Sequence, residues 1–293
     1  MPSLRSGPAP PHRPTMPELP ELQAHAERLE ADLGGAVLSG FRALSFTALK
    51  TYAPDPAAAV GRPVRGVRRR GKYLLLQIGE LHFVVHLMQG GRLKPDPSQS
   101  AKPRGGVARW TFDDGRALLL SEPGTERRAG VWVLEGDPLV QPPLEELGPD
   151  ADALDADGWA ALLADRTGRL HGVLRDQRAV AGIGRRLANE ICHRARLSPF
   201  ASSAKLTPPQ VDQLVDAVQA CLAEALDEER SRSEMVKSAE RGGVHHLVGE
   251  PCPRGDGDTI RAVTYRAYTV AYCPTCQTDG RVLADNTTSK FLK

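Results

Sequence analysis

Six short apolar runs in the first half of the chain most constrain what it can fold into. They cover residues 36–46, 72–78, 81–87, 107–112, 117–121 and 130–134. An Asp113–Asp114–Gly115 turn separates two of the runs and predicts a hairpin. Short strands in this number, with little helical pattern between them, favour a β-sandwich or a barrel.

One helix is predicted ahead of these strands, over residues 20–34. Its apolar residues Leu22, Ala26, Leu29 and Leu33 recur at spacings of four, three and four, which place them on one helical face. The glycine pair at 34–35 supplies a C-terminal stop.

The second half of the chain has a different pattern. Helical periodicity covers about 157–166, 168–177, 185–195 and 207–227, and the last helix opens with Thr207 as N-cap and Pro208 in its first turn. Strand and turn signals return around cysteines after residue 248. We therefore expect the α+β class, with a disordered leader or mis-assigned start at 1–15, a β-sandwich with a leading helix at 16–135, an acidic linker at 136–156, a helical domain at 157–248 and a ribbon at 249–293.

The charges reverse sign at the middle of the chain. Residues 135–165 hold nine acidic side chains and no lysine or arginine, whereas residues 166–196 hold eight arginines against two acidic residues. The first stretch predicts a solvated acidic connection. The second predicts a positive face that could take phosphates, although a charge block is often only a solvated surface.

Composition narrows the class of protein further. No stretch approaches the roughly 18 consecutive apolar residues that a membrane span needs, so no membrane partner is expected. The 293-residue chain has five cysteines, an odd number, and no secretory signal. This indicates a reducing cytoplasm rather than a disulfide framework.

The segment MPELPE at 16–21 resembles the start of a chain. Residues 1–15 hold five prolines and no apolar run. One interpretation is a disordered tail ahead of a helix; the other is that Met16 is the initiator and Pro17 the true N-terminus. In the second case Pro17 offers a secondary amine, whose pKa of about 8 leaves part of it unprotonated and nucleophilic. Glu18 beside it could shuttle protons.

Two further segments could contact an anion. Lys72 follows a basic cluster, at the mouth of a predicted strand, where an ordinary solvated lysine is the alternative. Residues 174–186 predict a helix end, a Gly182-x-Gly184 turn and a new helix start. Backbone N–H groups there could hold a phosphate, although a simple helix connection is the alternative.

The cysteines near the C-terminus predict an incomplete zinc ribbon. Cys273 and Cys276 form one C-x2-C pair, and Cys252 lies upstream, but Gly255 occupies the position that would complete the second pair. A fourth ligand could come from Asp256, His245 or His246. Alternatively, the ribbon folds without metal.

Four ordered signatures carry a resemblance to a known family. MPELPE at 16–21, GKYLLL at 71–76, DQRAVAGIG at 176–184 and GEPC…YCPTCQ at 249–277 resemble the formamidopyrimidine-DNA glycosylase/endonuclease VIII family, and MPELPE favours its formamidopyrimidine branch. The resemblance implies a β-sandwich, a helix-two-turn-helix domain and a C-terminal zinc finger, with DNA between the domains. It also implies a bifunctional DNA glycosylase/AP lyase that excises oxidised bases, mainly purines, in base excision repair.

The resemblance assigns roles to individual residues. Pro17 is the Schiff-base nucleophile, Glu18 acts on the sugar, Glu21 supports the site and Lys72 contacts phosphate. The expected DNA contacts are Arg127, Arg128, Arg178, Arg185, Arg186 and Arg266, and the expected zinc ligands are Cys252, Asp256, Cys273 and Cys276. The partner implied is double-stranded DNA with a damaged or abasic site, bound by a monomer in the cytoplasm of a bacterial-type cell, at the nucleoid.

Several positions depart from the family pattern. Arg185 stands where the family has an asparagine, and Tyr268 stands where a finger arginine is expected, with Arg266 two residues earlier. Gln89 stands near the usual methionine, and ERRAG at 126–130 leaves Arg127 or Arg128 to fill the space of an extruded base. These departures favour an alternative, a non-catalytic damaged-DNA-binding paralogue. A zinc-ribbon RNA-binding protein is a third possibility, which leaves the Pro-Glu start unexplained.

Overall fold

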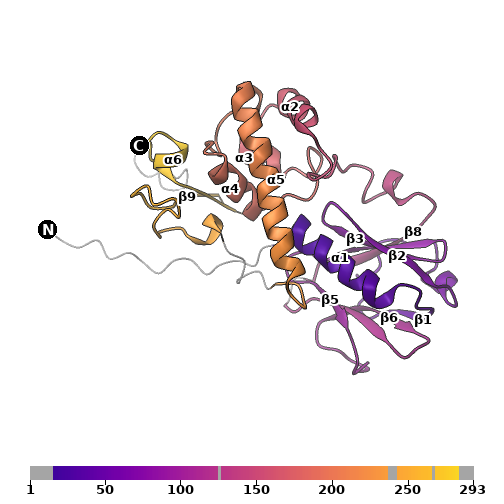
Figure 1. The fold of residues 1–293 in the computed structure, drawn as a ribbon. Helices are drawn as coiled ribbons and strands as arrows, with labels where there is room; N and C mark the ends of the chain where they lie inside the picture. Colours follow the sequence, from indigo (N-terminus) through magenta and orange to yellow (C-terminus); the bar gives the residue numbers. More distant parts are fainter. Residues whose placement is uncertain (1–15, 125–126, 237–242, 266–267, 284–293) are drawn as a thin grey trace.

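The computed structural model describes residues 16–124, 127–236, 243–265 and 268–283, so the expected leader at 1–15 lies outside it. Figure 1 shows a β-rich body and a helical body, with a small ribbon beside the helical one. The expected α+β class, with a sandwich, a helical domain and a C-terminal ribbon, is confirmed.

Two antiparallel sheets of four strands each make up the β-rich body among the described residues. In the first, the strands lie in the order β1 (Leu38–Ala43), β6 (Gly106–Phe112), β7 (Ala117–Ser121) and β5 (Arg92–Pro95). In the second, the order is β2 (Val64–Arg70), β3 (Tyr73–Ile78), β4 (Leu81–His86) and β8 (Gly130–Glu135). The predicted hairpin at 113–115 joins β6 to β7.

The sequence pattern did not predict strands β2 and β5, and the reason is physical. Strand β2 reads VRGVRRR and buries only Val64 and Val67, because it lies at the edge of its sheet. Strand β5 has four residues, ends in Pro95 and lies at the other sheet's edge. Edge strands need few apolar residues, so their sequences carry little of the strand pattern.

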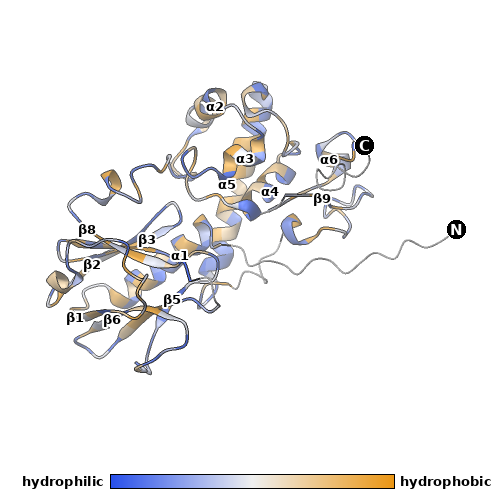
Figure 2. Cartoon of the chain, turned by 180° about the vertical axis from the view of Figure 1, so that it is seen from behind, coloured by the Kyte–Doolittle hydropathy of each residue, from blue (hydrophilic) through white to orange (hydrophobic). Residues whose placement is uncertain are grey.

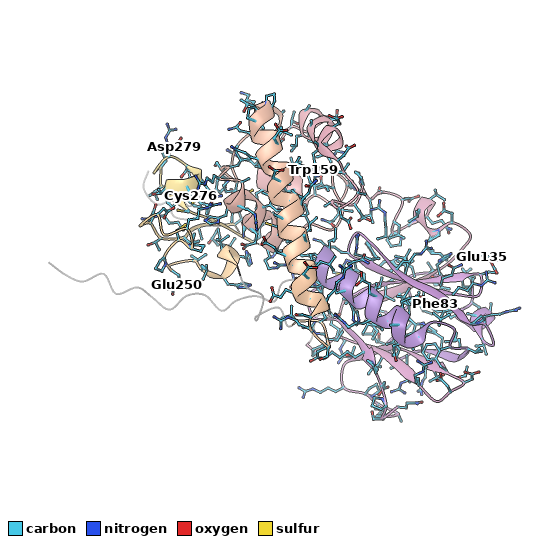
Figure 3. The ribbon with its side chains drawn as sticks, in the orientation of Figure 1. Phe83, Glu135, Trp159, Glu250, Cys276 and Asp279 are labelled. Carbon is cyan, nitrogen blue, oxygen red and sulfur yellow. The ribbon has the colours of Figure 1, made fainter. Side chains whose placement is uncertain are left out.

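Both sheets and helix α1 (Leu19–Leu33) share one hydrophobic core. The side chains of Phe83 and Trp110 are fully buried, and the ring of Phe41 lies 5.4 and 5.1 Å from theirs. The predicted apolar face of α1 packs into the same core. Figure 3 shows Phe83 between the sheets.

The second body contains helices α2 (Ala156–Asp165), α3 (Leu170–Arg175), α4 (Arg185–Arg194) and α5 (Pro208–Arg230). They surround a separate core that includes the fully buried Trp159. Figure 2 shows hydrophobic residues on α3, in the middle of this body. The ribbon consists of β9 (Arg261–Thr264), β10 (Thr269–Tyr272) and α6 (Pro274–Gln277). Short 3-10 helices lie at Pro56–Ala59, Pro138–Val140, Ser203–Lys205 and Val244–His246.

None of the helices in the described ranges has the length and apolar content that crossing a membrane requires.

Helices α1 and α5 lie side by side and join the two bodies (Figure 1). The Arg28 guanidinium donates to the Glu229 carbonyl oxygen over 2.9 Å, and the Arg230 guanidinium pairs with the Glu27 carboxylate at 2.7 Å. These contacts connect residues that are about 200 positions apart in the chain.

The acidic linker is more than the solvated connection that its composition predicts. Asp150 accepts hydrogen bonds from the Arg69 guanidinium over 2.9 Å and from the Gly71 N–H over 2.8 Å. Asp152 pairs with the other Arg69 nitrogen at 2.9 Å, and the Arg69 side chain is only 4% exposed. The linker carboxylates therefore hold the end of β2, and with it the start of β3, against the helical body.

We predict that Asp150→Asn destabilises the protein by about 3 kcal/mol, because it removes the carboxylate charge that the Arg69 and Arg70 guanidinium groups share and leaves Asp152 as the remaining acidic partner of the buried Arg69. The matched control is Glu80→Gln, whose ion pair with Arg65 is exposed and should contribute under about 1 kcal/mol. Thermal denaturation followed by circular dichroism measures both. Equal melting temperatures for the two variants would contradict the prediction.

Candidate active site

The side chain of Glu18 reaches from the β-rich body to the first turn of α4. Its two carboxylate oxygens accept hydrogen bonds from the backbone N–H groups of Arg186, over 3.1 Å, and Leu187, over 3.0 Å. The first N–H groups of a helix have no partner within the helix, and they attract a carboxylate. Glu18 is 2% exposed and is held at the junction of the two bodies.

Glu21 also links the two bodies at this junction, through its own pair of hydrogen bonds. One carboxylate oxygen accepts the Glu18 N–H over 2.8 Å, and the other accepts from the Arg186 guanidinium over 2.7 Å. Burial on its own would lower the pKa of Arg186, but the Glu21 and Glu18 carboxylates raise it above its ordinary value. Arg186 is therefore a buried partner of the carboxylates, whereas the sequence suggested a surface side chain for phosphate.

The glycine turn before α4, residues 182–184, packs closely against Glu18 and Leu19. A Cβ atom on Gly184 would lie 2.2 Å from the nearer Glu18 carboxylate oxygen, so only glycine leaves the carboxylate in place. Gly182 has a φ of 100° and accepts the Leu19 N–H over 3.0 Å. The sequence suggested that this helix N-terminus could hold a phosphate; in the structure its N–H groups at 186 and 187 bind Glu18 instead.

A small pocket of about 180 Å³ opens beside Glu18. Three cationic residues line it, Lys72 from the start of β3, Arg175 from the end of α3 and Arg185 from the start of α4. Burial lowers the pKa of Lys72; Glu18 and Glu21 oppose this shift, and Arg185 and Arg175 add to it. Met16, Gln89 and Gly184 complete the lining. A concentration of positive charge in a small concavity suits a phosphate.

Tyr268 of the ribbon holds Arg175 at this pocket. The guanidinium carbon of Arg175 lies 3.7 Å from the centre of the Tyr268 ring, a cation–π contact. The ring also stacks on Tyr265, at 4.7 Å, and lies parallel to His171 at 6.1 Å. Burial and the nearby Arg175 lower the pKa of His171 to about 3. The imidazole is therefore neutral at pH 7, and Arg175 is the charged member of this stack.

The sequence did not single out Arg175 or His171. The available signal was their spacing of four residues on one short helix, next to the glycine turn. Tyr268 was noted only as a departure from a family pattern, and the structure shows what it contacts.

The other expected DNA contacts lie away from this pocket. Arg127 and Arg128 are exposed ahead of β8, where the N–H groups of Arg128 and Ala129 donate to the Glu122 carboxylate. Arg178 is exposed and pairs with Glu146 at 2.6 Å. Arg266 lies outside the described residues.

A second cluster lies in the ribbon, where the ligand atoms of Cys252, Asp256, Cys273 and Cys276 are within 4.8 Å of one another. The thiols of Cys252 and Cys276 are 3.8 Å apart, and the Cys273 thiol lies 3.1 Å from a carboxylate oxygen of Asp256. Thiolates and a carboxylate are a suitable donor set for zinc. Of the other candidates, His245 hydrogen-bonds Asn189 over 2.6 Å and is not part of the cluster.

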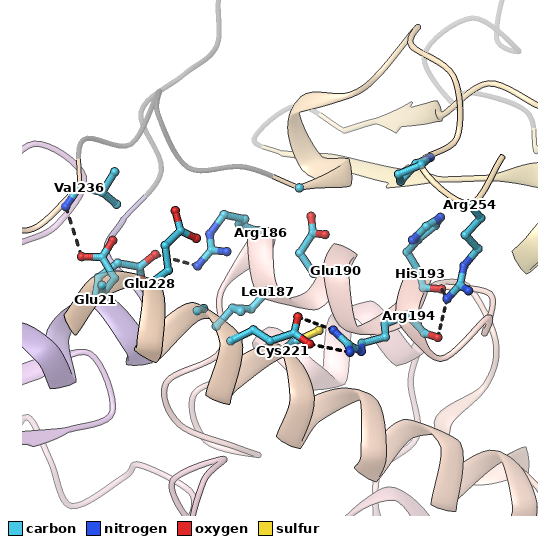
Figure 4. Close-up of a pocket in the computed structure, with 15 residues that line it drawn as sticks. Glu21, Arg186, Leu187, Glu190, His193, Arg194, Cys221, Glu228, Val236 and Arg254 are labelled. Atoms are coloured by element: carbon cyan, nitrogen blue, oxygen red, sulfur yellow. Dashed lines mark hydrogen bonds and ion pairs between the residues drawn. The ribbon is translucent and has the colours of Figure 1, made fainter. Parts of the chain in front are cut away.

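A larger pocket of about 540 Å³ lies between α4, α5 and the ribbon (Figure 4). Its lining holds five glutamates and three arginines: Glu21, Glu190, Glu224, Glu228, Glu229, Arg186, Arg194 and Arg254. Arg186 and Arg194 already pair with Glu21 and Glu224, so this pocket offers a phosphate less net positive charge than the small one, and size does not identify the candidate site here.

Comparison with known proteins places both bodies in one family. The model of the formamidopyrimidine-DNA glycosylase N-terminal domain matches residues 16–132, and that of the formamidopyrimidine-DNA glycosylase H2TH domain matches residues 147–237. A formamidopyrimidine-DNA glycosylase of Chloroflexus aurantiacus is 32% identical over 277 residues, which cover 89% of this chain and 98% of the relative.

Solved structures agree with this result. The MutM (Fpg) protein of Thermus thermophilus matches with a TM-score of 0.76 and 28% identity, over 89% of this chain and 98% of that one. A Lactococcus lactis formamidopyrimidine-DNA glycosylase, solved non-covalently bound to DNA containing an AP site, shares the fold with a TM-score of 0.74 and 21% identity. That match covers 89% of this chain and 99% of the other.

We predict that Gly184→Ala lowers the free energy of unfolding by about 3 kcal/mol, because the added methyl group displaces Glu18 from the α4 N–H groups. Gly172→Ala in α3 is the matched control; nothing lies within 4 Å of its Cβ position, and alanine favours a helix over glycine by about 1 kcal/mol. Denaturant unfolding compares the variants. A Gly184→Ala protein as stable as the wild type would contradict the expected displacement.

Proposed function

The chain belongs to the formamidopyrimidine-DNA glycosylase family, and from this premise we propose that it is a bifunctional DNA glycosylase and AP lyase. It removes oxidised bases, chiefly purines, from double-stranded DNA in base excision repair. The observation that carries this proposal is a pocket lined by Lys72, Arg175 and Arg185 together with Met16 and Glu18, the two chain neighbours of Pro17. It combines a nucleophile, a proton-transfer group and a phosphate-binding surface.

Pro17 is the proposed nucleophile. It is buried next to Glu18, and Met16 lines the pocket. We propose that the active form begins at Pro17, after removal of Met16, so that its secondary amine opens on the pocket. The family match beginning at residue 16 supports this start. An α-amine with a pKa of about 8 is partly neutral at pH 7, which an attacking nitrogen requires.

The proposed reaction begins with attack on the sugar. The Pro17 nitrogen forms a bond to C1′ as the bond from C1′ to the damaged base breaks, and the base leaves as an anion that takes a proton from water. The Glu18 carboxylate accepts the proton that the attached Pro17 nitrogen releases and delivers it to the ring oxygen as the sugar ring opens, which leaves an iminium between Pro17 and C1′. The close contacts of Glu18 with α4 hold it in position for this transfer.

The iminium then makes strand cleavage possible. It withdraws electrons from C2′, so a C2′ proton can pass to the Glu18 carboxylate while the bond from C3′ to its phosphate oxygen breaks. The phosphate leaves with that electron pair, and the strand is cut. Water hydrolyses the remaining iminium conjugate and returns the free amine of Pro17.

The three cations are proposed to hold the phosphate next to the lesion. Among the described residues, Lys72 has no hydrogen bond or ion pair of its own, so its ammonium group is available to an anion. Arg185 replaces the neutral amide that the family resemblance implies, and the stack on Tyr268 presents Arg175 in place of a finger arginine. Arg127, Arg128, Arg178 and Arg266 are proposed to contact DNA outside this pocket.

The ribbon is proposed to hold a structural zinc ion through Cys252, Asp256, Cys273 and Cys276. The ion supplies a cross-link that stabilises the fold of the ribbon, and it takes no part in the reaction. We propose that the protein acts as a monomer on DNA of the bacterial nucleoid, in the cytoplasm.

We predict that protein expressed from Met16, with the methionine removed, forms a covalent adduct with an abasic-site oligonucleotide when borohydride is present. Borohydride reduces the iminium to a stable amine, which a denaturing gel and mass spectrometry detect. The 293-residue chain, in which Pro17 is a tertiary amide, should form at least about 100-fold less adduct, because an amide nitrogen cannot form the iminium.

Pro17→Gly is the matched control, since it keeps a terminal amine and should retain some trapping. DNA binding is measured in parallel by fluorescence anisotropy. A protein beginning at Pro17 that binds abasic DNA tightly but never traps would overturn the enzyme proposal and support the non-catalytic damaged-DNA-binding protein.

We also predict that Arg175→Gln weakens abasic-DNA binding. The slope of the logarithm of the binding constant against the logarithm of the salt concentration should become shallower by about 0.9, which corresponds to the loss of about one phosphate contact. Tyr268→Leu should weaken binding less, because the arginine stays but is no longer held. Arg194→Gln is the control, since Arg194 pairs with Glu224 and lines the larger pocket rather than the small one. A slope for Arg175→Gln equal to that of the control would remove Arg175 from the phosphate site.

A further inference from the structure

His193, in the last turn of α4, contacts the metal cluster of the ribbon. Its Nε2 atom lies 3.4 Å from the Cys252 sulfur and 3.5 Å from the Cys276 sulfur. The side chain is 6% exposed, so water does not compete for this nitrogen as it would at the surface. His193 comes from the helical body, whereas all four proposed ligands belong to the ribbon.

The charge of the proposed metal site explains why a donor is needed there. Three thiolates and one carboxylate around a zinc dication leave a net charge of about −2. Cys252 and Cys273 are buried, and buried charge is stable only where hydrogen-bond donors face it. A neutral imidazole has one N–H donor, and both sulfurs lie within hydrogen-bonding distance of Nε2.

Other contacts keep the ribbon on the same helix. The Arg254 guanidinium donates to the carbonyl oxygens of His193, over 3.1 Å, and Arg194, over 2.8 Å, at the C-terminal end of α4 (Figure 4). Asn189 accepts the Ala271 N–H of strand β10 over 3.2 Å. These bonds engage polar groups of the ribbon outside the cysteine cluster, whereas His193 contacts the cluster itself.

We propose that His193 is a positioning residue of the metal site, which donates its Nε2–H to the Cys252 and Cys276 thiolates and so ties a bound zinc ion to α4. The inference rests on the metal site proposed above. Helix α4 has ten residues, about 15 Å, and its other end holds Glu18. Metal occupancy and the alignment of Glu18 therefore depend on the same helix.

The test is the rate at which the holoprotein loses zinc to a chromogenic chelator. His193→Phe keeps a flat buried ring but has no N–H, and it should bind one equivalent of zinc yet release it at least about tenfold faster, the usual effect of losing a partner of a metal ligand. His193→Gln restores an N–H donor and should release zinc within about threefold of the wild-type rate. His82→Phe, a buried histidine of β4, is the matched control and should release zinc like the wild type.

Cobalt substitution distinguishes a donor from a ligand. If His193 donates a hydrogen bond, the d–d absorption bands of Co(II)-loaded His193→Phe should keep their pattern, because the four ligands are unchanged. A changed band pattern, with less than one equivalent bound, would make His193 a ligand and overturn the proposal. Equal zinc release from His193→Phe and the wild type would also overturn it.

The metal site itself is tested by the same preparation. A wild-type protein that takes up no zinc would overturn both the metal site and the role of His193. That result would leave the chemistry at Pro17 intact, because borohydride trapping tests it separately.

Discussion

The contact between the Glu18 carboxylate and the first turn of α4 is the interaction on which the rest of the site depends. It joins residues 168 positions apart and fixes the β-rich body against the helical body at the point of the proposed chemistry. Gly184 is needed because a side chain there would overlap the carboxylate. Glu21 and Arg186 are needed because they hold the Glu18 backbone and α4 from the other side.

Charge is divided across this junction. On one side, Lys72, Arg175 and Arg185 line the small pocket. On the other, five glutamates and three arginines line the larger pocket between α4, α5 and the ribbon. The buried Arg186–Glu21 pair lies on the side of the larger pocket, which explains why an arginine of the basic stretch is unavailable to a phosphate. A polyanion would be attracted more strongly to the small pocket, whose lining has three cations and one carboxylate, than to the larger one.

Two of the departures from the family pattern lie next to residues that can offset them. Tyr268 does not supply a cation, but its ring holds Arg175 at the pocket. Gly255 stands at the position of a missing cysteine, but the Asp256 carboxylate lies within the cluster of Cys252, Cys273 and Cys276, and His193 from α4 contacts two of these thiols. In each case the neighbouring side chain comes from the helical body. Docking of the ribbon on α3 and α4 thus brings together groups that neither segment holds alone.

The sequence by itself determined the fold class, the predicted helices and most strands, because apolar periodicity and turn residues are local properties. It also singled out Pro17, Glu18, Lys72 and the cysteines as candidates, since these lie in short motifs. It did not determine which arginines line the small pocket: Arg186 is buried against Glu21, whereas Arg175 lines the pocket and was not singled out. The sequence also did not predict the contacts of Arg69 with Asp150 and of His193 with Cys252. Only the tertiary structure decided them, because each joins side chains dozens of residues apart, and local patterns contain no information about that distance.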